Sequence, residues 1–294
     1  MRSVLGIDAA WSDRHPSGVA LAAWIGDAWH CLRLAPSYAD FCLGRRQRAD
    51  RRQAGHVFDA DRVLHTCREL LGGSLPDVVA VDMPLAHAPI ARRRPADDAI
   101  ARAFGHAKCA THSPLPDRPG ITGTRLQEGL ARCGFALRTA VDESGSAGSL
   151  IEVYPHVGLL GLMRAPVRVT YKASKTNTYW RGCSLAERRV RLISTWQSVL
   201  ARLRRSMPGI PPDLATIADD VPLNCLKWRE DSIDALLCAW MGARWLEGAS
   251  IPYGDGASAV WVPADSLPYA RPQSVAGAAA AGRHSVRPRR PAVS

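Results

Sequence analysis

Residues 3–24, SVLGIDAAWSDRHPSGVALAAW, decide how the rest of the chain folds. An apolar run over residues 4–7 ends at Asp8, and a polar loop leads into a second apolar run over residues 18–25. This pattern predicts a β-hairpin whose first strand is buried and carries a carboxylate at its tip. A buried carboxylate is costly unless it meets a cation, a hydrogen-bond donor or solvent. We therefore expect Asp8 to bind a divalent metal.

The segments after the hairpin predict that a second carboxylate, that of Asp82, lies beside Asp8. Residues 28–34 alternate like a third strand, so the chain opens with an antiparallel meander. Residues 56–71 carry apolar residues at helical spacing, and residues 77–82 form another buried strand that ends at Asp82. A helix between two strands favours a right-handed crossover and parallel pairing. Asp8 and Asp82 would then lie side by side at the carboxyl edge of the sheet.

The middle of the chain adds one more acidic strand. Residues 150–155 (LIEVYP) predict a short strand in which alternation places Leu150, Glu152 and Tyr154 on one face. Glu152 is either a metal ligand or a surface residue of an edge strand, and we favour the ligand. Other elements expected here are helices at residues 96–105, 124–134, 156–163 and 184–205, a loop at 111–123 and a final strand at 258–262.

The last long helix supplies two further carboxylates. We expect it to start at Glu230, which places Asp231 and Asp234 on one face of its first turn. Acidic residues at a helix start are also common as caps, and this alternative stays open. Four small residues would let the helix lie close to the sheet: Ala235, Cys238, Ala239 and Gly242.

The chain thus presents carboxylates at four places: Asp8, Asp82, Glu152 and the Asp231/Asp234 pair. Such an arrangement suits two Mg²⁺ (or Mn²⁺) ions about 3.5–4 Å apart, which promote in-line attack on a phosphodiester. Mg²⁺ needs only a few carboxylate oxygens, because waters and substrate phosphate complete its shell. The order of the four places along the chain is more specific than any one of them.

The composition of the chain indicates which binding partners and which cellular compartment to expect. The chain has 294 residues, 47% of them hydrophobic, and a formal net charge of +11. A basic surface favours nucleic acid, but only four of the 38 basic residues are lysine, and this skew is also typical of a GC-rich genome. The eight cysteines include no CxxC pair, which argues against a zinc ribbon. Without a signal peptide or a run of about 18 apolar residues, we expect a cytoplasmic protein with no membrane contact.

Seven segments carry a resemblance to a known family. They are GIDAAWSD (6–13), VDMPL (81–85), RPADDAIARAFG (94–105), THSPLP (111–116), IEVYPH (151–156), YK (171–172) and LKWREDSIDALLCAW (226–240). The chain resembles the DUF429 family, described as predicted ribonuclease H-like nucleases, over most of residues 3–262. The hairpin with its Asp, the crossover and the late D-x-x-D helix are similar to the ribonuclease H-like superfamily, and to its Holliday-junction resolvase branch.

This resemblance implies roles for the acidic residues. Asp8 would bridge both metals, Asp82 would bind one of them, and Asp231 or Asp234 would bind the other. Glu152 would complete the catalytic set. The cofactor implied is Mg²⁺ or Mn²⁺.

The resemblance also implies residues that bind the substrate. Lys172 and Lys175 would contact the scissile phosphate, although a solvated loop is an equal alternative. Arg94, with Asp97 and Arg102, matches a family pattern, and its role is either substrate binding or a structural ion pair. Basic residues 45–52 and the segment 171–181 are candidate nucleic-acid contacts or ordinary loops.

The fold expected is α/β and ribonuclease H-like, with a mixed central sheet, an antiparallel meander plus parallel strands, flanked by helices. It would form one domain over 1–265 with insertions around 85–148 and 165–225, followed by a disordered basic tail over 271–294.

The function expected is a two-metal nuclease acting on RNA, RNA/DNA hybrid or branched DNA. The alternatives are an actin-like or sugar-kinase-type phosphotransferase, whose Gly-rich phosphate loops the sequence lacks, and a catalytically inactive nucleic-acid-binding protein. The sequence does not predict the oligomeric state.

Overall fold

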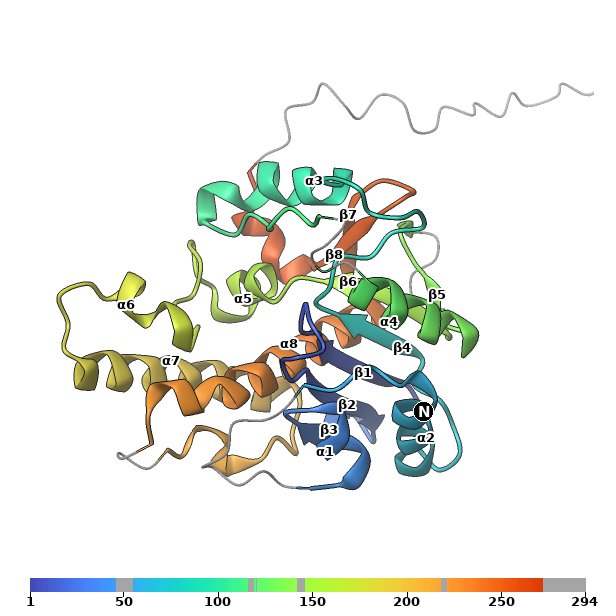
Figure 1. Ribbon diagram of the computed structural model, residues 1–294, viewed down its shortest axis with the longest axis horizontal. Helices are drawn as coiled ribbons and strands as arrows, with labels where there is room; N and C mark the ends of the chain where they lie inside the picture. Colours follow the sequence, from blue (N-terminus) through green and yellow to red (C-terminus); the bar gives the residue numbers. More distant parts are fainter. Residues whose placement is uncertain (46–54, 116–118, 120, 142–145, 218–220, 272–294) are drawn as a thin grey trace, which may run out of the picture.

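The fold is built on one mixed β-sheet. The computed structural model describes residues 1–45, 55–115, 119, 121–141, 146–217 and 221–271. In this part of the chain the sheet has eight strands in the order β3-β2-β1-β4-β6-β8-β7, with β5 beside β6 (Figure 1). The strands are β1 (Ser3–Asp8), β2 (Gly18–Ile25), β3 (Ala28–Ala35), β4 (Val78–Val81), β5 (Ala136–Leu137), β6 (Ser149–Val153), β7 (Ser250–Gly254) and β8 (Ala259–Pro263).

The strand directions match those predicted. β1, β2 and β3 form an antiparallel meander. β4 pairs parallel with β1, and β6 and β8 continue in parallel. The predicted class, an α/β fold with a mixed sheet flanked by helices, is confirmed, and it is consistent with a ribonuclease H-like fold.

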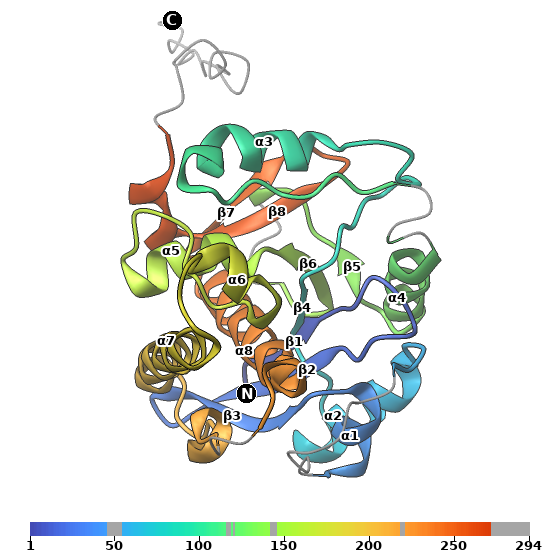
Figure 2. The ribbon, with the colours of Figure 1, turned by 60° about the vertical axis from the view of Figure 1, so that its left-hand side comes forward.

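Helices cover both faces of the sheet. They are α1 (Tyr38–Leu43), α2 (Ala60–Leu70), α3 (Pro95–Phe104), α4 (Ile121–Arg132), α5 (Pro155–Met163), α6 (Thr176–Tyr179), α7 (Leu185–Ser206) and α8 (Lys227–Leu246). Buried residues of α5, α7 and α8 share one core with the sheet, and those of α1, α2 and α4 share the core on the opposite face (Figure 2). α3 packs instead against β7 and β8 at the end of the sheet (Figure 2).

Alternation along β1 decides which face Asp8 takes. Val4 belongs to the core beneath α8, whereas Leu5 and Ile7 belong to the opposite core beneath α2. Successive side chains of a strand point to opposite faces. Asp8 is four residues after Val4, so its carboxylate is on the α8 face.

α8 lies in backbone contact with this face. A methyl group added at Gly6 would overlap the backbone of Ala239, and one added at Gly18 would overlap the carbonyl of Asp231. Gly242 of the helix faces β1 and β4 just as closely. Glycine within a strand often marks a place where another backbone approaches. The predicted close packing of α8 on the sheet is confirmed.

The start of α8 differs from the prediction. The helix begins at Lys227 and follows a 3₁₀ turn (Leu223–Leu226) without a break. Asp231 and Asp234 therefore lie in its second turn, not in its first. The N-cap is Leu226, whose side chain caps nothing. The helix-cap alternative for these two acids is wrong, because the helix starts one turn before them.

Other boundaries differ by a few residues. α2 begins at Ala60, where Asp59 caps the helix through a 3.1 Å hydrogen bond to the N–H of Arg62. The predicted start of α7 is confirmed, with a Ser184/Glu187 capping box. The strands β5 and β7 were not predicted.

Some predictions lie beyond the structure described. The basic segment after Arg45 and the tail after Arg271 fall outside the described residues, and the domain boundaries stay predictions. In the ranges the structure describes, no helix is long and apolar enough to cross a bilayer.

Candidate metal centre and adjoining pocket

Three carboxylates meet where β1 ends beneath α8. One oxygen each of Asp8, Asp231 and Asp234 lies within 4.8 Å of the others. Asp8 is the last residue of β1, and the two helix residues are three apart, so they share one side of α8. Asp231 and Asp234 are buried, and Asp8 is partly exposed. The structure thus brings together three of the acids predicted from the sequence.

Asp82 lies beside this group. Its backbone N–H donates a 2.9 Å hydrogen bond to the carbonyl of Ile7, which places it level with Asp8 at the edge of the sheet. Ala80, two residues earlier, belongs to the core beneath α8, so Asp82 points to the same face. Burial, followed by repulsion from Asp8, raises the pKa of Asp82 well above its usual range. Its predicted place next to Asp8 is therefore what the structure shows.

Two lysines neutralise part of this charge. Lys172 Nζ contacts Asp234 Oδ2 and lies 3.5 Å from Glu230 Oε1. Lys227 Nζ contacts Asp231 Oδ1 and lies 3.2 Å from the same Glu230 oxygen. Among the described residues, these two ammonium groups form ion pairs with Glu230, Asp231 and Asp234, and with neither Asp8 nor Asp82.

The pKa values of the three clustered acids are raised first by burial and then by their shared negative charge. Burial raises the pKa of Asp8 to about 7, and repulsion from Asp231 is the next cause. Burial also raises the pKa values of Asp231 and Asp234 to about 6, although their lysine partners limit the rise. Each acid holds its proton more tightly than in water, because burial disfavours the charged form and the lysines compensate only in part.

The donor set fits a hard divalent cation. Carboxylate oxygens are ligands that Mg²⁺ and Mn²⁺ prefer. In an octahedral Mg²⁺ shell, opposite ligands are about 4.2 Å apart, so three oxygens within 4.8 Å of one another nearly match one shell. A divalent cation would also supply the charge that the lysines do not. Asp8, Asp231 and Asp234 are the residues that would hold it.

Glu152 points away from this group. It pairs with Val81 across the β4–β6 ladder, and Val81 belongs to the core opposite α8. Its two oxygens accept hydrogen bonds of 2.5 and 2.7 Å from Arg94, and Oε2 also accepts from the N–H of Leu85 at 2.7 Å. Glu152 is therefore outside the Asp8, Asp231 and Asp234 group, but it lines the same pocket as Asp82.

Arg94 uses all of its donors inside the protein. Nε and Nη2 each donate to Asp97 at 3.0 Å, Nη1 donates to the carbonyl of Leu85 at 2.7 Å, and Glu152 accepts the remaining two bonds. The ion-pair alternative for Arg94 describes this arrangement, and the predicted substrate contact would require one of these bonds to break. The ion-paired group holds Leu85, three residues after Asp82, and so fixes the chain where β4 ends.

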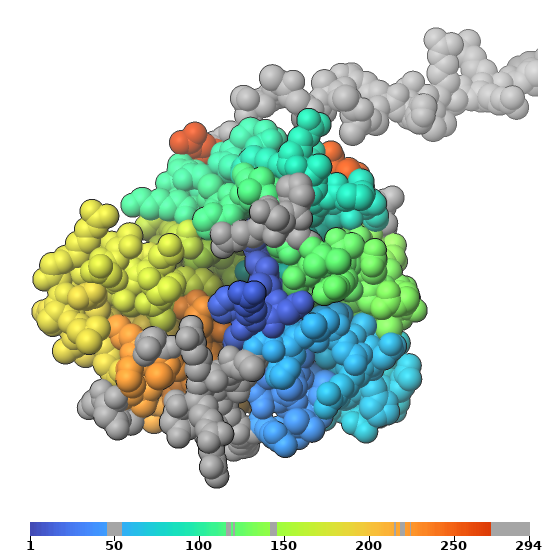
Figure 3. Space-filling view, viewed as in Figure 1, coloured from blue at the N-terminus to red at the C-terminus, as the bar shows by residue number. Residues whose placement is uncertain are grey.

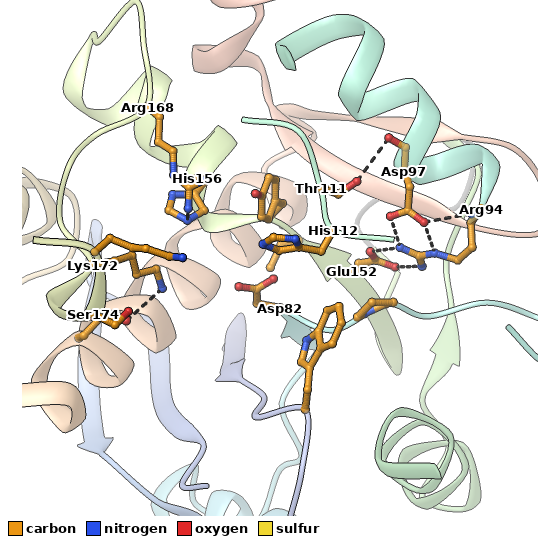
Figure 4. A pocket seen from close by; sticks show the side chains of 16 residues that line it. Asp82, Arg94, Asp97, Thr111, His112, Glu152, His156, Arg168, Lys172 and Ser174 are labelled. Carbon is orange, nitrogen blue, oxygen red and sulfur yellow. Dashed lines mark hydrogen bonds and ion pairs between the residues drawn. The ribbon is translucent and has the colours of Figure 1, made fainter. Parts of the chain in front are cut away.

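A pocket of about 290 Å³ opens beside Asp82 (Figure 4). Its acidic lining residues are Asp82, Asp97, Glu152 and Glu230, and its lysines are Lys172 and Lys175, which were both predicted to bind substrate. Arg94 also lines it. In the space-filling view the start of the chain, in dark blue, reaches the surface between the yellow and green segments (Figure 3).

The family described as "Protein of unknown function (DUF429)" matches residues 6–257. The chain belongs to the DUF429 family. No curated protein and no solved structure matches it. Because the matched range runs from before Asp8 to beyond Asp234, the carboxylate cluster of this DUF429 protein lies wholly within the family's part of the chain.

Sequence reasoning missed the lysine counter-ion of Asp231 in this DUF429 protein. Lys227 and Glu230 lie one turn or less before Asp231, but their spacing alone predicts no site. The usable signal was the scarcity of lysine: three of the four lysines in this arginine-rich chain, Lys172, Lys175 and Lys227, gather around the cluster and its pocket.

Proposed function

We propose that this DUF429 protein is a divalent-metal-dependent hydrolase that cleaves phosphodiester bonds in nucleic acid. The observation that carries the proposal is the meeting of Asp8, Asp231 and Asp234 at the carboxyl edge of the sheet. A bound Mg²⁺ or Mn²⁺ would hold a phosphate oxygen and lower the pKa of a water molecule. The net charge of +11 supports a polyanionic substrate.

The neighbouring residues have distinct roles in this proposal. With a single ion bound, the ionised carboxylate of Asp82, which lines the pocket, would accept a proton from the attacking water. The Tyr171 hydroxyl donates a 2.5 Å hydrogen bond to Asp234 Oδ1 and holds that carboxylate in place. Lys172 bonds the other oxygen of Asp234. If two ions bind, Asp8 and Asp82 would hold the second one.

A cleavage assay tests this function directly. The purified protein is incubated with Mg²⁺ or Mn²⁺ and labelled single-stranded RNA, single-stranded DNA, RNA/DNA hybrid and a four-way DNA junction. We expect cleavage of at least one substrate, lost on chelation and reduced at least 100-fold in Asp8→Asn and Asp234→Asn. Asp13→Asn is the matched control, because Asp13 lies in the loop after β1 and pairs with Arg125 at 3.4 Å.

Three results would count against the proposal. They are cleavage of none of these substrates with either metal, cleavage that persists in the chelator, and equal rates for Asp8→Asn and wild type. ATP hydrolysis without cleavage of nucleic acid would instead favour the phosphotransferase alternative.

A further inference from the structure

One side of the pocket carries cationic groups that no acid neutralises. Arg168 and Lys175 both line it. Lys172 is paired with Asp234, but among the described residues neither Arg168 nor Lys175 has a carboxylate within ion-pair distance. Figure 4 shows Arg168 and Lys172 on the side of the pocket opposite Arg94, with Asp82 between the two sides.

A buried histidine orients the guanidinium of Arg168. His156, in the first turn of α5, is 6% exposed, and its Nε2 contacts Nη2 of Arg168. A guanidinium can only donate, so Nε2 must accept and the ring proton is on Nδ1. The imidazole is therefore neutral and holds Arg168 without cancelling its charge. The rings of Tyr154 and Tyr171 pack edge-on against the imidazole, at 5.5 and 5.3 Å.

The His156–Arg168 pair also has two N–H donors that lack an acceptor among the described residues. In the described structure, His156 Nδ1 and Arg168 Nε have no hydrogen-bond partner, although both atoms are buried. Buried polar groups in proteins are nearly always paired, and an exception calls for an explanation such as a missing ligand. An anion in the pocket would supply oxygen acceptors to the donors of Arg168 and Lys175.

We propose that Arg168, oriented by His156, and Lys175 form an anion subsite that binds a phosphate of the substrate. This phosphate is a different one from that at the metal, and in this form the inference rests on the proposed function. A guanidinium matches a pair of phosphate oxygens with two parallel N–H donors. Lys175 is exposed and adds a mobile positive charge.

The size of the pocket limits what can carry this phosphate. A volume of about 290 Å³ is at the small end of the range for ligand sites. A unit the size of one nucleotide fits this volume. We expect one phosphate of the substrate at Arg168 and a neighbouring phosphate at the Asp8 cluster.

Phosphate binding tests the subsite without any catalysis. Inorganic phosphate is titrated calorimetrically into the full-length protein with no divalent metal present. We expect millimolar or tighter binding by wild type, at least tenfold weaker binding in Arg168→Ala, and about threefold weaker binding in Lys175→Ala. Arg68→Ala is the charge-matched control on α2 and should bind within twofold of wild type.

The outcomes separate the subsite from the nuclease proposal. No phosphate binding by wild type, or equal binding by the Arg168 and Arg68 variants, would overturn the subsite. If Arg168→Ala does not fold, the exposed Lys175 decides: unchanged binding in Lys175→Ala overturns the proposal. Phosphate binding without cleavage of any nucleic acid would reject the nuclease and keep the subsite.

Discussion

Gly6 of β1 lies directly against the backbone of Ala239 in α8. Gly6 precedes Asp8 by two residues on the same face of the strand, and Ala239 follows Asp234 by about one and a half helical turns. The contact therefore sets how far α8 lies from the sheet. The distance between the carboxylates of Asp8 and Asp234 depends on it.

Replacing Gly6 by alanine should destabilise the protein. The new methyl group would overlap the backbone of Ala239 and Ala235, neither of which can rotate away. Overpacking of this kind costs about 1–3 kcal/mol, measured as the free energy of unfolding in urea. Gly105→Ala is the control, since a methyl group there meets nothing within 4 Å, and its effect should be below about 0.5 kcal/mol. Equal stability of the two variants would show that α8 can shift away from β1.

Replacing Arg94 by glutamine should also be costly. Asp97 and Glu152, 1% and 4% exposed, would remain buried without their cation. Removing one partner of a buried ion pair costs about 3–5 kcal/mol. Arg125→Gln breaks an exposed pair with Asp13, where the side chains are 49% and 34% exposed, and should cost less than about 1 kcal/mol. Urea unfolding of both variants at pH 7 measures the difference, and similar losses would contradict a buried structural role for Arg94.

Without metal, Asp8→Asn should stabilise the folded protein at high pH. The pKa of the Asp8 carboxyl is about 7 in the folded protein. Its ordinary value, which applies to the unfolded chain, is 3.8. Between these values the native state binds more protons than the unfolded state, so this group lowers stability as pH rises from about 4 to 7. Asp8→Asn has no carboxyl that ionises at this position, so its stability does not fall in this way. We expect its free energy of unfolding at pH 8 to exceed that of wild type by about 1–3 kcal/mol.

The same comparison at low pH provides the control for Asp8→Asn. At pH 4 the carboxyl is neutral in the folded protein, so the gain should largely disappear. Asp13→Asn should change stability little at either pH. Chemical unfolding in a chelating buffer gives the two curves. A loss of stability in Asp8→Asn at pH 8 would show that Asp8 is adequately compensated by its lysine neighbours.

Removing Lys227 should strengthen metal binding. Its ammonium contacts Asp231 and lies 3.2 Å from Glu230, where a metal would compete for the same oxygens, and its side chain is 52% exposed. Losing one nearby positive charge favours a cation by roughly 1 kcal/mol, or about fivefold in affinity. Titration of Mn²⁺ followed by calorimetry at pH 8 measures this change in Lys227→Ala.

Two comparisons support the interpretation of the Lys227 variant. Arg68→Ala removes a distant surface charge and should leave Mn²⁺ affinity unchanged. Asp231→Asn should weaken binding at least tenfold, because it removes a ligand oxygen. Weaker Mn²⁺ binding in Lys227→Ala would mean that Lys227 organises the carboxylates and does not compete with the ion.

The positions of Asp8 and Asp82 could be predicted from the sequence because they depend on segments that follow one another along the chain. A buried strand ending at Asp8, a helix, and a second buried strand ending at Asp82 leave little choice of topology, since right-handed crossovers dominate. The small residues of α8 likewise showed which side would pack on the sheet. The pairing of Glu152 with Arg94 could not be predicted, because alternation shows which residues share a face and does not show which face that is.

The amino-acid sequence by itself determined the meander, the parallel crossover, the DUF429 match and the choice of Asp8, Asp82, Asp231 and Asp234, since these follow from periodicity and from motifs along the chain. Only the tertiary structure decided that Glu152 belongs to Arg94 and that lysines serve the carboxylate cluster. The physical reason is that the register of the strands and the position of α8 on the sheet bring together side chains that are distant in the sequence. Burial of these side chains then determines which charges must be paired.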